Sequence, residues 1–407
     1  MPNPPTPPPY TLTPLATLDP PSQERTWQTA PHPRLPIVAT CSADKTIRIY
    51  SLTNFRLLST ITGGHKRSVR TAAWKPHVTG ESVLASGSFD ATAGIWRRWD
   101  NYTSSQIQSQ SQGNEDGDAA WGTSPAHPDP SEDIPEAEDD DEEWRFAVLL
   151  DGHDSEVKSV AWSASGLLLA TCSRDKSIWI WEDLDDGDNN FETVAVMQEH
   201  EGDVKCVAWH PAEECLVSGS YDDTIRVWRE DLDDWGQVAC LRGHGGTVWG
   251  YRTLSGPRII SCSDDRSVRV WRRQPKLGMT TELGPGNMPS IIRPTGLDEV
   301  WEEEAVLPAV HDLAVYSVAW SRRTGLVASV GADGRVVVYE ERRASLSLLP
   351  PTEWVVVALL NGAHGIYEIN HVAWAKRADR GRDPSKEEEV LITTADDGSV
   401  KVWTVQQ

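Results

Sequence analysis

Short runs of alternating apolar and polar residues recur along the chain, and Gly, Asp or Ser residues separate them. Residues 157–162, 167–172 and 177–181 are rich in Val, Ile and Trp, and a fourth run such as 144–150 or 238–241 precedes a Gly-His pair. Runs of this length and composition predict β-strands. Four such strands form a sheet too small to bury both of its faces, so neighbouring units must stack around a common channel.

A polar pattern repeats in register with these strands. A His is followed nine residues later by Trp, then by Ser-x-Asp, and an aromatic residue stands six positions past the Asp. The full pattern predicts four structural quartets: His65, Ser88, Asp90 and Trp96; His153, Ser173, Asp175 and Trp181; His200, Ser220, Asp222 and Trp228; and His244, Ser263, Asp265 and Trp271. Incomplete copies at His311/Asp333/Tyr339 and His364/Asp397/Trp403, with a half copy at Ser42/Asp44/Tyr50, bring the count to seven units.

A period near 43 residues with Gly-His and Trp-Asp marks resembles the WD40 repeat. The resemblance implies an all-β fold, a seven-bladed WD40 β-propeller, in which the quartets are hydrogen-bonded chains that tie the strands of a blade together. We expect the four complete blades to be firmly built and those near the ring seam to be looser. The last unit ends four residues before the C-terminus, so we expect the alternating segment 10–18 to supply its outer strand and close the ring.

The domain organisation follows from these repeats. Residues 1–9 are Pro-rich and expected to be disordered, and residues 10–407 form a single propeller. Residues 101–143 hold 13 acidic and no basic residues, which predicts a disordered insertion in blade 2. A further loop insertion is expected at 272–299 in blade 5. These loops leave one face of the ring, the bottom, and with a net charge of −23 they argue against nucleic acid as a partner.

Several functional classes are disfavoured by the sequence. No apolar run approaches the length of a membrane span, and the N-terminus does not have the pattern of a signal peptide. The cysteines form no CxxC or Cys/His cluster, so no metal and no cofactor is expected. Cys41, Cys172 and Cys262 occupy equivalent places, where we interpret them as small core residues. Ser, His and Asp recur in every unit, which a single active site would not need, so we do not expect an enzyme.

The face opposite the long loops is the candidate partner-binding surface, which we call the top face. The residue before each repeat Asp and the residue five after each His are predicted to be exposed there. These positions collect Arg and aromatic residues, which dominate protein–protein hot spots. The predicted partner-binding residues are Arg174, Lys158, Lys205, Arg70, Tyr221, Trp249, Phe89 and Tyr316. The competing face is the bottom, because insertions in repeat proteins often mark the binding side.

Blades two to five carry a more specific resemblance. The strings SFDAT, EVKSVAW, CSRDKS, SYDDT and SDDR, in that order, are similar to the WD-repeat subunit of the cytosolic iron–sulfur protein assembly (CIA) targeting complex. This resemblance implies a scaffold without its own cluster, which is cytoplasmic, with the nucleus as a second location. Its implied partners are a small cluster-handling subunit, a HEAT-repeat subunit, an iron-only-hydrogenase-like carrier, and apo iron–sulfur client proteins. It also implies that Arg174, in CSRDKS, is exposed.

Two other functions compete with this interpretation. A ubiquitin-ligase substrate receptor usually carries Asp-x-Arg after the blade-ending Trp, and the residues after Trp96, Trp181, Trp228 and Trp271 do not fit that mark. A reader of histone or chromatin peptides stays open, because acidic propellers can attract basic tails.

Overall fold

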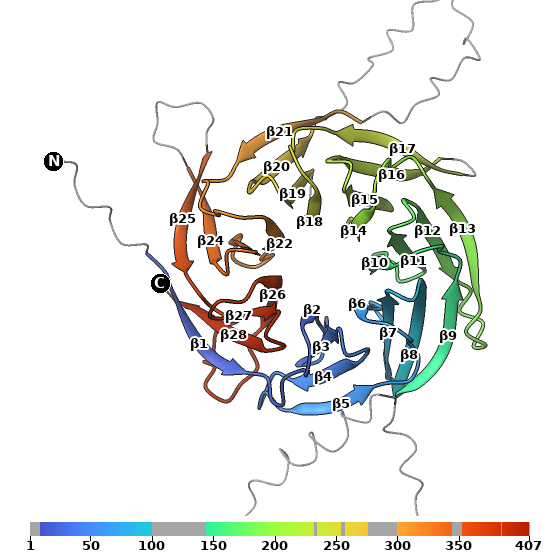
Figure 1. Cartoon of the computed structure of the whole chain (residues 1–407), viewed down its shortest axis with the longest axis horizontal. Helices are drawn as coiled ribbons and strands as arrows, with labels where there is room; N and C mark the ends of the chain where they lie inside the picture. Colours follow the sequence, from blue (N-terminus) through green and yellow to red (C-terminus); the bar gives the residue numbers. More distant parts are fainter. Residues whose placement is uncertain are drawn as a thin grey trace, which may run out of the picture.

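The computed structural model describes residues 9–99, 144–231, 234–253, 257–275, 299–343, 352–383 and 385–406. These residues form seven four-stranded antiparallel sheets arranged as a ring around a central channel (Figure 1). The predicted seven-bladed β-propeller is therefore confirmed. The expected disorder at 101–143, most of the expected disordered stretch at 1–9, and most of the insertion at 272–299 concern residues outside the described part of the chain.

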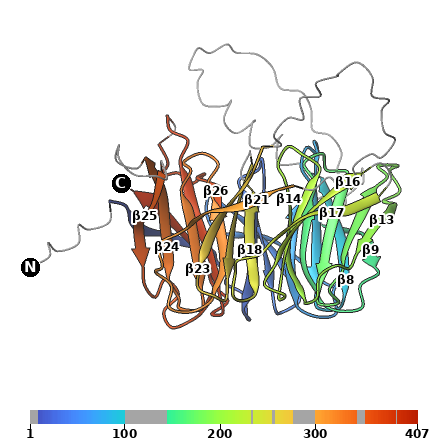
Figure 2. The same ribbon diagram turned by 90° about the horizontal axis from the view of Figure 1, so that it is seen from above.

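Each blade is numbered by its place in the sequence, and its innermost strand is named first. Blades 1 to 3 contain β2 (Thr26–Pro31), β3 (Ile37–Ser42), β4 (Ile47–Ser51) and β5 (Leu57–Ile61); β6 (Val69–Trp74), β7 (Glu81–Ser88), β8 (Thr92–Trp99) and β9 (Arg145–Asp151); and β10 (Val157–Trp162), β11 (Leu168–Ser173), β12 (Ile178–Asp183) and β13 (Phe191–Met197). Figure 2 shows that the strands of the blades lie side by side and run from one face of the ring to the other.

The remaining blades repeat this order. Blades 4 to 6 contain β14 (Val204–Trp209), β15 (Cys215–Ser220), β16 (Ile225–Asp231) and β17 (Asp234–Leu241); β18 (Val248–Thr253), β19 (Arg258–Ser263), β20 (Val268–Arg273) and β21 (Trp301–Val306); and β22 (Val315–Trp320), β23 (Val327–Gly331), β24 (Val336–Arg343) and β25 (Thr352–Leu360). Blade 7 contains β26 (Ile369–Lys376), β27 (Glu389–Ala395), β28 (Val400–Gln406) and, from the other end of the chain, β1 (Thr11–Thr17).

The two ends of the chain close the ring. Strand β1 pairs antiparallel with β28, with Thr13 opposite Thr404, and Leu18 N–H donates to the Val400 carbonyl at 2.9 Å. Figure 1 shows β1 lying along the outer edge of blade 7. The segment predicted to complete the last blade does so, and blade 7 consequently depends on residues almost 400 positions apart.

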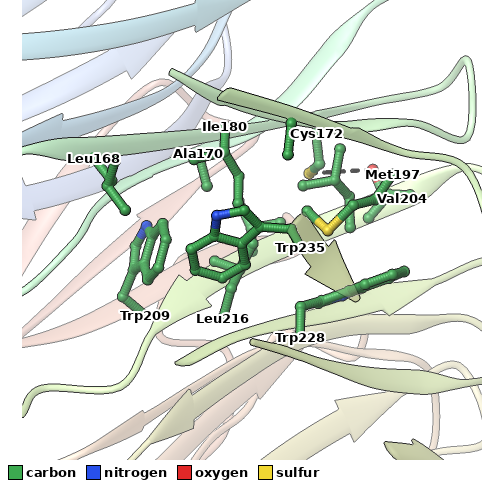
Figure 3. Close-up of a cluster of buried hydrophobic side chains, with 13 residues drawn as sticks. Leu168, Ala170, Cys172, Ile180, Met197, Val204, Trp209, Leu216, Trp228 and Trp235 are labelled. Carbon is green, nitrogen blue, oxygen red and sulfur yellow. Dashed lines mark hydrogen bonds between the residues drawn. The ribbon is translucent and has the colours of Figure 1, made fainter. Parts of the chain in front are cut away.

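The hydrophobic core is divided among the seams between blades. Figure 3 shows the seam of blades 3 and 4, where Ile180 and Met197 face Trp209 and Leu216. Equivalent apolar clusters fill the other six seams. Strands β3, β11, β15 and β27 are buried along their whole described lengths except for the first residue of β27, which explains why their sequences are small and apolar, interrupted mainly by Ser and Thr.

The cysteines that occupy equivalent places are small core residues, as predicted. Cys41, Cys172 and Cys262 are each at most 1% exposed, and burial raises the pKa of the Cys172 thiol well above its usual range. Blades 2 and 4 have Gly87 and Gly219 at this place. A Cβ on Gly87 would lie 2.6 Å from a Val157 methyl of the next blade. The close approach of neighbouring blades therefore selects small residues here.

On the bottom face, ion pairs join neighbouring blades. Arg229 of blade 4 and Arg273 of blade 5 both contact Glu213 and Glu299, at distances from 2.6 to 3.3 Å. Hydrogen bonds from Arg273 and Arg229 lower the pKa of Glu213 to about 2. Between blades 5 and 6, Arg258 bonds Glu341 at 2.8 Å. These ion pairs neutralise the carboxylates of Glu213, Glu299 and Glu341 on this face.

We predict that ring closure depends on Leu18, which is 1% exposed and lies in the seam between blades 7 and 1. Replacing it by Ala should lower the free energy of unfolding by about 2–5 kcal/mol, the usual cost of a Leu-to-Ala cavity. Urea unfolding of Leu18→Ala measures this, with Thr11→Ala as control because Thr11 is exposed on the same N-terminal segment. Equal stability of the two variants would contradict a role for this segment in closing the core.

Candidate partner-binding face

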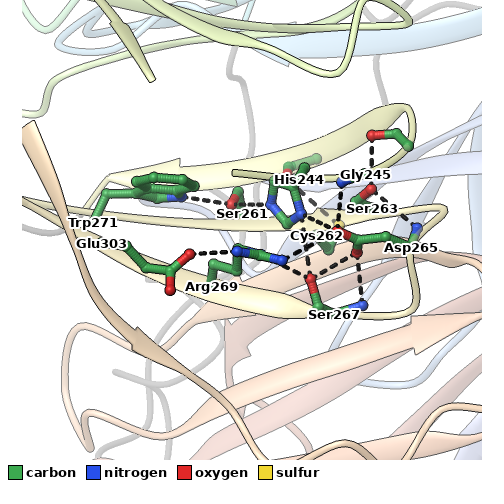
Figure 4. A network of polar contacts seen from close by, with 12 residues as sticks. His244, Gly245, Ser261, Cys262, Ser263, Asp265, Ser267, Arg269, Trp271 and Glu303 are labelled. Atoms are coloured by element: carbon green, nitrogen blue, oxygen red, sulfur yellow. Dashed lines mark hydrogen bonds and ion pairs between the residues drawn. The ribbon is translucent and has the colours of Figure 1, made fainter. Parts of the chain in front are cut away.

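Polar hydrogen-bonded chains hold the top of each blade, and blade 5 shows the arrangement clearly (Figure 4). Trp271 Nε1 donates to Ser261 Oγ at 2.8 Å, and Ser261 Oγ lies 2.7 Å from His244 Nε2. His244 Nδ1 lies 2.9 Å from an Asp265 carboxylate oxygen. The same carboxylate accepts the Gly245 and Ser267 backbone N–H groups, at 3.0 and 2.9 Å. One chain therefore links strands β19 and β20, and the turn between them, to the loop that enters the blade.

The His, Asp and Trp residues of the four predicted quartets occupy these chains, but the predicted serines do not. The hydroxyl between His and Trp comes from the residue two positions earlier: Ser86, Thr171, Ser218 and Ser261 rather than Ser88, Ser173, Ser220 and Ser263. In blade 2, Ser86 pairs across the sheet with Gly94, and the Trp96 ring leans back over that glycine to reach it. The cross-strand register, which the spacing did not reveal, thus selects the hydroxyl.

The displaced serines have a separate task. Each donates to a carbonyl of the loop entering its blade and accepts the backbone N–H of the Asp two residues later. The donated bonds run from Ser88 to Arg67 (3.2 Å), from Ser173 to Ser155 (2.9 Å), from Ser220 to Gly202 (3.1 Å) and from Ser263 to Gly246 (2.8 Å). They fix the loop geometry on the top face.

Blades 6 and 7 were predicted to be incomplete, and this was wrong. His311 Nε2 lies 2.7 Å from Ser329 Oγ, which bonds the Tyr339 hydroxyl at 3.3 Å. In blade 7, Thr393 Oγ1 lies 2.8 Å from His364 Nε2 and accepts Trp403 Nε1 at 2.9 Å. The hydroxyl of each chain comes from a residue two positions before the one that the sequence pattern predicted. Blades 6 and 7 therefore have complete chains, and there is no longer a reason to expect them to be looser.

Blade 1 lacks the His and replaces it differently. Ser22 Oγ donates to Asp44 at 3.0 Å and lies 2.5 Å from Ser42 Oγ. Arg48 pairs with the same Asp44 carboxylate at 2.7 Å. The segment that connects β1 to blade 1 therefore supplies the contact that a histidine supplies elsewhere.

The chain aspartates are strongly biased toward their charged form. Burial opposes ionisation of Asp175, but hydrogen bonds from His153 and Ser177 outweigh it and hold the pKa of this carboxyl well below its usual range. The same causes, with the equivalent partners, lower the pKa values of Asp90, Asp222 and Asp265. These carboxylates are hydrogen-bond acceptors within the chains.

A ring of side chains surrounds the mouth of the channel above these chains. In every blade the innermost strand has a β-bulge at its second residue, so that residue has no partner in the ladder. Bulges turn a side chain away from the regular pleat. The bulged residues are Trp27, Arg70, Lys158, Lys205, Trp249, Tyr316 and Asn370. The structure thus brings together the five that were predicted five positions after a His.

Trp27 and Asn370 were missed by the sequence prediction. Blade 1 has no His from which to count, and blade 7 carries one extra residue between His364 and its bulge. The alternation of inward and outward side chains along β2 and β26 is the only local signal for these two positions. Because each position is a bulge, the alternation is interrupted there and the signal is lost.

Each cation at this mouth lies beside an aromatic ring. Arg70 lies 5.1 Å from the centre of the Trp27 ring, and Lys158 Nζ lies 4.3 Å from the centre of the Phe89 ring. Lys205 Nζ lies 5.5 Å from the Tyr221 ring and 5.1 Å from the Trp249 ring. Such cation–π contacts are worth about 0.5–2 kcal/mol each. They hold the long basic side chains in place beside the opening.

Tyr316 extends the aromatic surface into blade 6. Its ring packs edge-on against Trp249, with 5.3 Å between the ring centres, and its hydroxyl bonds Glu368 at 3.0 Å. Trp249 Nε1 donates to Asp264 at 2.5 Å. The half of the mouth beyond Lys205 is therefore aromatic and acidic, whereas blades 2 to 4 supply the cations.

Arg174 lies outside this ring, on the turn between β11 and β12. Its side chain is 58% exposed, and Nη1 lies 3.3 Å from Glu156 Oε1. Burial works against ionisation of Glu156, but the Ser155 hydroxyl and the nearby Lys158 and Arg174 charges outweigh it and lower its pKa to about 2. Arg174 thus keeps part of its guanidinium free for a partner. Glu156, which orients it, was not among the predicted residues.

The bulge ring surrounds a small hollow at the top of the channel, whose lining includes Arg70, Lys158, Lys205, Trp249 and Tyr316. The bottom opens into a larger hollow whose lining includes five tryptophans at the ends of the inner strands. Several of these indoles are already used: Trp74, Trp209 and Trp374 donate to carbonyls of the preceding blade, at 2.8 to 3.2 Å.

Within the described ranges, no group of three His, Cys, Asp or Glu side chains is placed to hold a metal ion. The same residues contain no helix long and apolar enough to cross a membrane.

The comparisons with known proteins agree on one family. The WD domain, G-beta repeat family matches residues 13–51, 144–182, 191–229, 235–272 and 304–340. A protein of Aspergillus niger called "Probable cytosolic iron-sulfur protein assembly protein 1" is 74% identical over 95% of each chain. Proteins with the same name from Emericella nidulans (66% identical, 96% of each chain) and Aspergillus terreus (67% identical, 97% of this chain and 98% of the relative) are also similar.

We predict that the Thr171 hydroxyl, and not merely the side-chain volume, stabilises blade 3. Thr171→Val should cost about 2–4 kcal/mol, because it leaves His153 Nε2 and Trp181 Nε1 buried and unpaired. Thr171→Ser keeps the hydroxyl that four other blades supply from Ser and should cost much less. Urea unfolding compares the two, and a smaller loss for Val than for Ser would contradict the assignment.

We also predict a stability loss in acid that depends on Asp175. Because its pKa is depressed in the folded protein, its contribution is complete above the unfolded value near 4 and is lost progressively as the pH falls from there through the folded pKa. At pH 7, Asp175→Asn should be less stable than the native chain by about 1.5–3 kcal/mol. The difference in urea midpoint between the two proteins should narrow as the pH is lowered from 7 to 3. A gap that stays constant over this range would show that the charge is not what stabilises the blade.

Proposed function

Because the chain belongs to the family of cytosolic iron–sulfur protein assembly protein 1, we propose that it is a non-catalytic scaffold of cytosolic iron–sulfur protein assembly. On this proposal it acts in the cytoplasm, with the nucleus as a second location, and carries no cluster itself. Its partners would be a small cluster-handling subunit, a HEAT-repeat subunit, an iron-only-hydrogenase-like carrier and apo iron–sulfur clients.

The observation that carries the proposal is that one set of polar residues has a structural role, while another set is exposed on the top face. The recurring His, Asp and Ser or Thr side chains are engaged in repeated structural chains, and the Asp carboxylates are held charged. The bulged and turn residues, by contrast, present Arg, Lys and aromatic side chains on short, tied-down loops. A rigid surface of this composition is suited to recognise another protein.

The chemistry favours a partner segment that carries carboxylates and an apolar side chain. A bidentate contact with Arg174 would give the geometric selectivity that a lysine lacks. Lys158 and Lys205 would attract a second carboxylate, while Tyr221, which is 62% exposed, and Trp249 would offer an apolar floor. A basic histone tail would fit this half of the mouth poorly, because Arg70, Lys158 and Lys205 would repel it.

We predict that reversing the charge of Arg174 weakens capture of clients or of the small subunit by at least tenfold, without changing the melting temperature. Affinity purification of tagged Arg174→Glu, followed by quantitative mass spectrometry, measures the loss. Arg322→Glu is the matched control, because Arg322 is an exposed arginine in the loop between β22 and β23, on the bottom face.

Three results would count against this proposal. Unchanged recovery of assembly partners by Arg174→Glu would remove Arg174 from the binding surface. Recovery of histones in place of iron–sulfur assembly factors by the native chain would favour the chromatin alternative. A lower melting temperature with unchanged capture would identify Arg174 as a structural residue of its turn.

A further inference from the structure

The cationic side chains of Arg70, Lys158 and Lys205 lie at the top of the channel, and within the described part of the chain only one of the three forms an ion pair with a carboxylate. Lys205 pairs with Asp203 at 3.1 Å. Among the described residues, neither Arg70 nor Lys158 has a carboxylate within ion-pair distance, although both side chains are only partly exposed. Glu156, the acidic residue nearest in sequence to Lys158, is engaged with Arg174. Burying a charge without a counter-charge is costly, so this arrangement calls for an anion.

The bulges make the three side chains converge. Strands β6, β10 and β14 are neighbours around the channel, and each has its cation at the same bulged position. All three residues line the hollow at the top of the channel. Burial lowers the pKa of Lys158 to about 8; the more distant Glu156 and Asp203 carboxylates oppose this shift, and the Lys205 and Arg70 charges add to it. The three positive charges are therefore close enough to repel one another.

We propose that this hollow is a binding site for a doubly charged oxyanion of the phosphate class, held between Arg70, Lys158 and Lys205. Two of the three cations lack a counter-charge, and a dianion matches that number whereas a single carboxylate does not. A guanidinium and two ammonium groups are the donors that proteins use for phosphate oxygens. The rings under each cation, Trp27, Phe89, Tyr221 and Trp249, keep the donors at the rim when the anion is absent.

This site lies in the mouth of the channel, deeper than Arg174, and goes beyond the proposed scaffold function. Its ligand is a small anion, either free or attached to a larger molecule as a phosphate monoester. The isolated chain suffices to test it, so the result does not depend on whether Arg174 captures clients.

The test is thermal unfolding of the full chain in increasing inorganic phosphate, compared with sodium chloride at equal ionic strength. Ligand that binds only the folded state raises the melting temperature in proportion to its occupancy, so the titration gives an apparent Kd. Lys158→Met removes the central charge and keeps an apolar side chain over Phe89. Lys176→Met, at an exposed lysine in the turn after β11, makes the same charge change outside the hollow.

Lys158→Met should weaken the apparent phosphate affinity at least tenfold, and Lys176→Met should change it less than twofold. Acetate should bind the native chain at least tenfold more weakly than phosphate. Equal phosphate responses of all three proteins would indicate a general salt effect and overturn the proposal, as would acetate matching phosphate. If Lys158→Met does not fold, Lys205→Met gives the same reading.

Discussion

Each four-stranded blade has two apolar faces and can bury them only against its neighbours, so the whole structure depends on a closed ring of seams. Seven apolar clusters fill these seams, and each is built from two consecutive blades. A ring of this kind has no end blade with an open face provided that the chain termini meet. The pairing of β1 with β28 meets that condition, and Leu18 carries the closure into the seam between blades 7 and 1.

The polar chains act within this frame and do not replace it. They join the strands of a single blade and fix the loops on the top face, because each carboxylate accepts N–H groups from a turn and from the loop entering the blade. Six blades have the full chain, and blade 1 substitutes Ser22 and Arg48 for the missing histidine. The top face is consequently a set of short, rigid loops, and the residues exposed on it are held in defined positions.

Charge is distributed unevenly over a strongly acidic protein. The net charge of −23 repels acidic partners at long range, but screening confines that repulsion to about 8–10 Å at physiological salt. Within that distance, Arg70, Lys158, Lys205 and Arg174 dominate one half of the channel mouth. Long-range repulsion and local attraction together favour partners that match the mouth closely over molecules that are merely acidic.

The sequence by itself determined the number of blades, the closing strand, the buried cysteines and five of the seven bulged residues, because strand alternation and repeat spacing are local properties of the chain. Only the tertiary structure decided that Ser86 and not Ser88 joins His65 to Trp96, that blades 6 and 7 are complete, and that Trp27 and Asn370 belong to the ring. Those outcomes depend on cross-strand register and on bulges. Both are properties of paired strands, so the spacing of residues along a single strand does not reveal them.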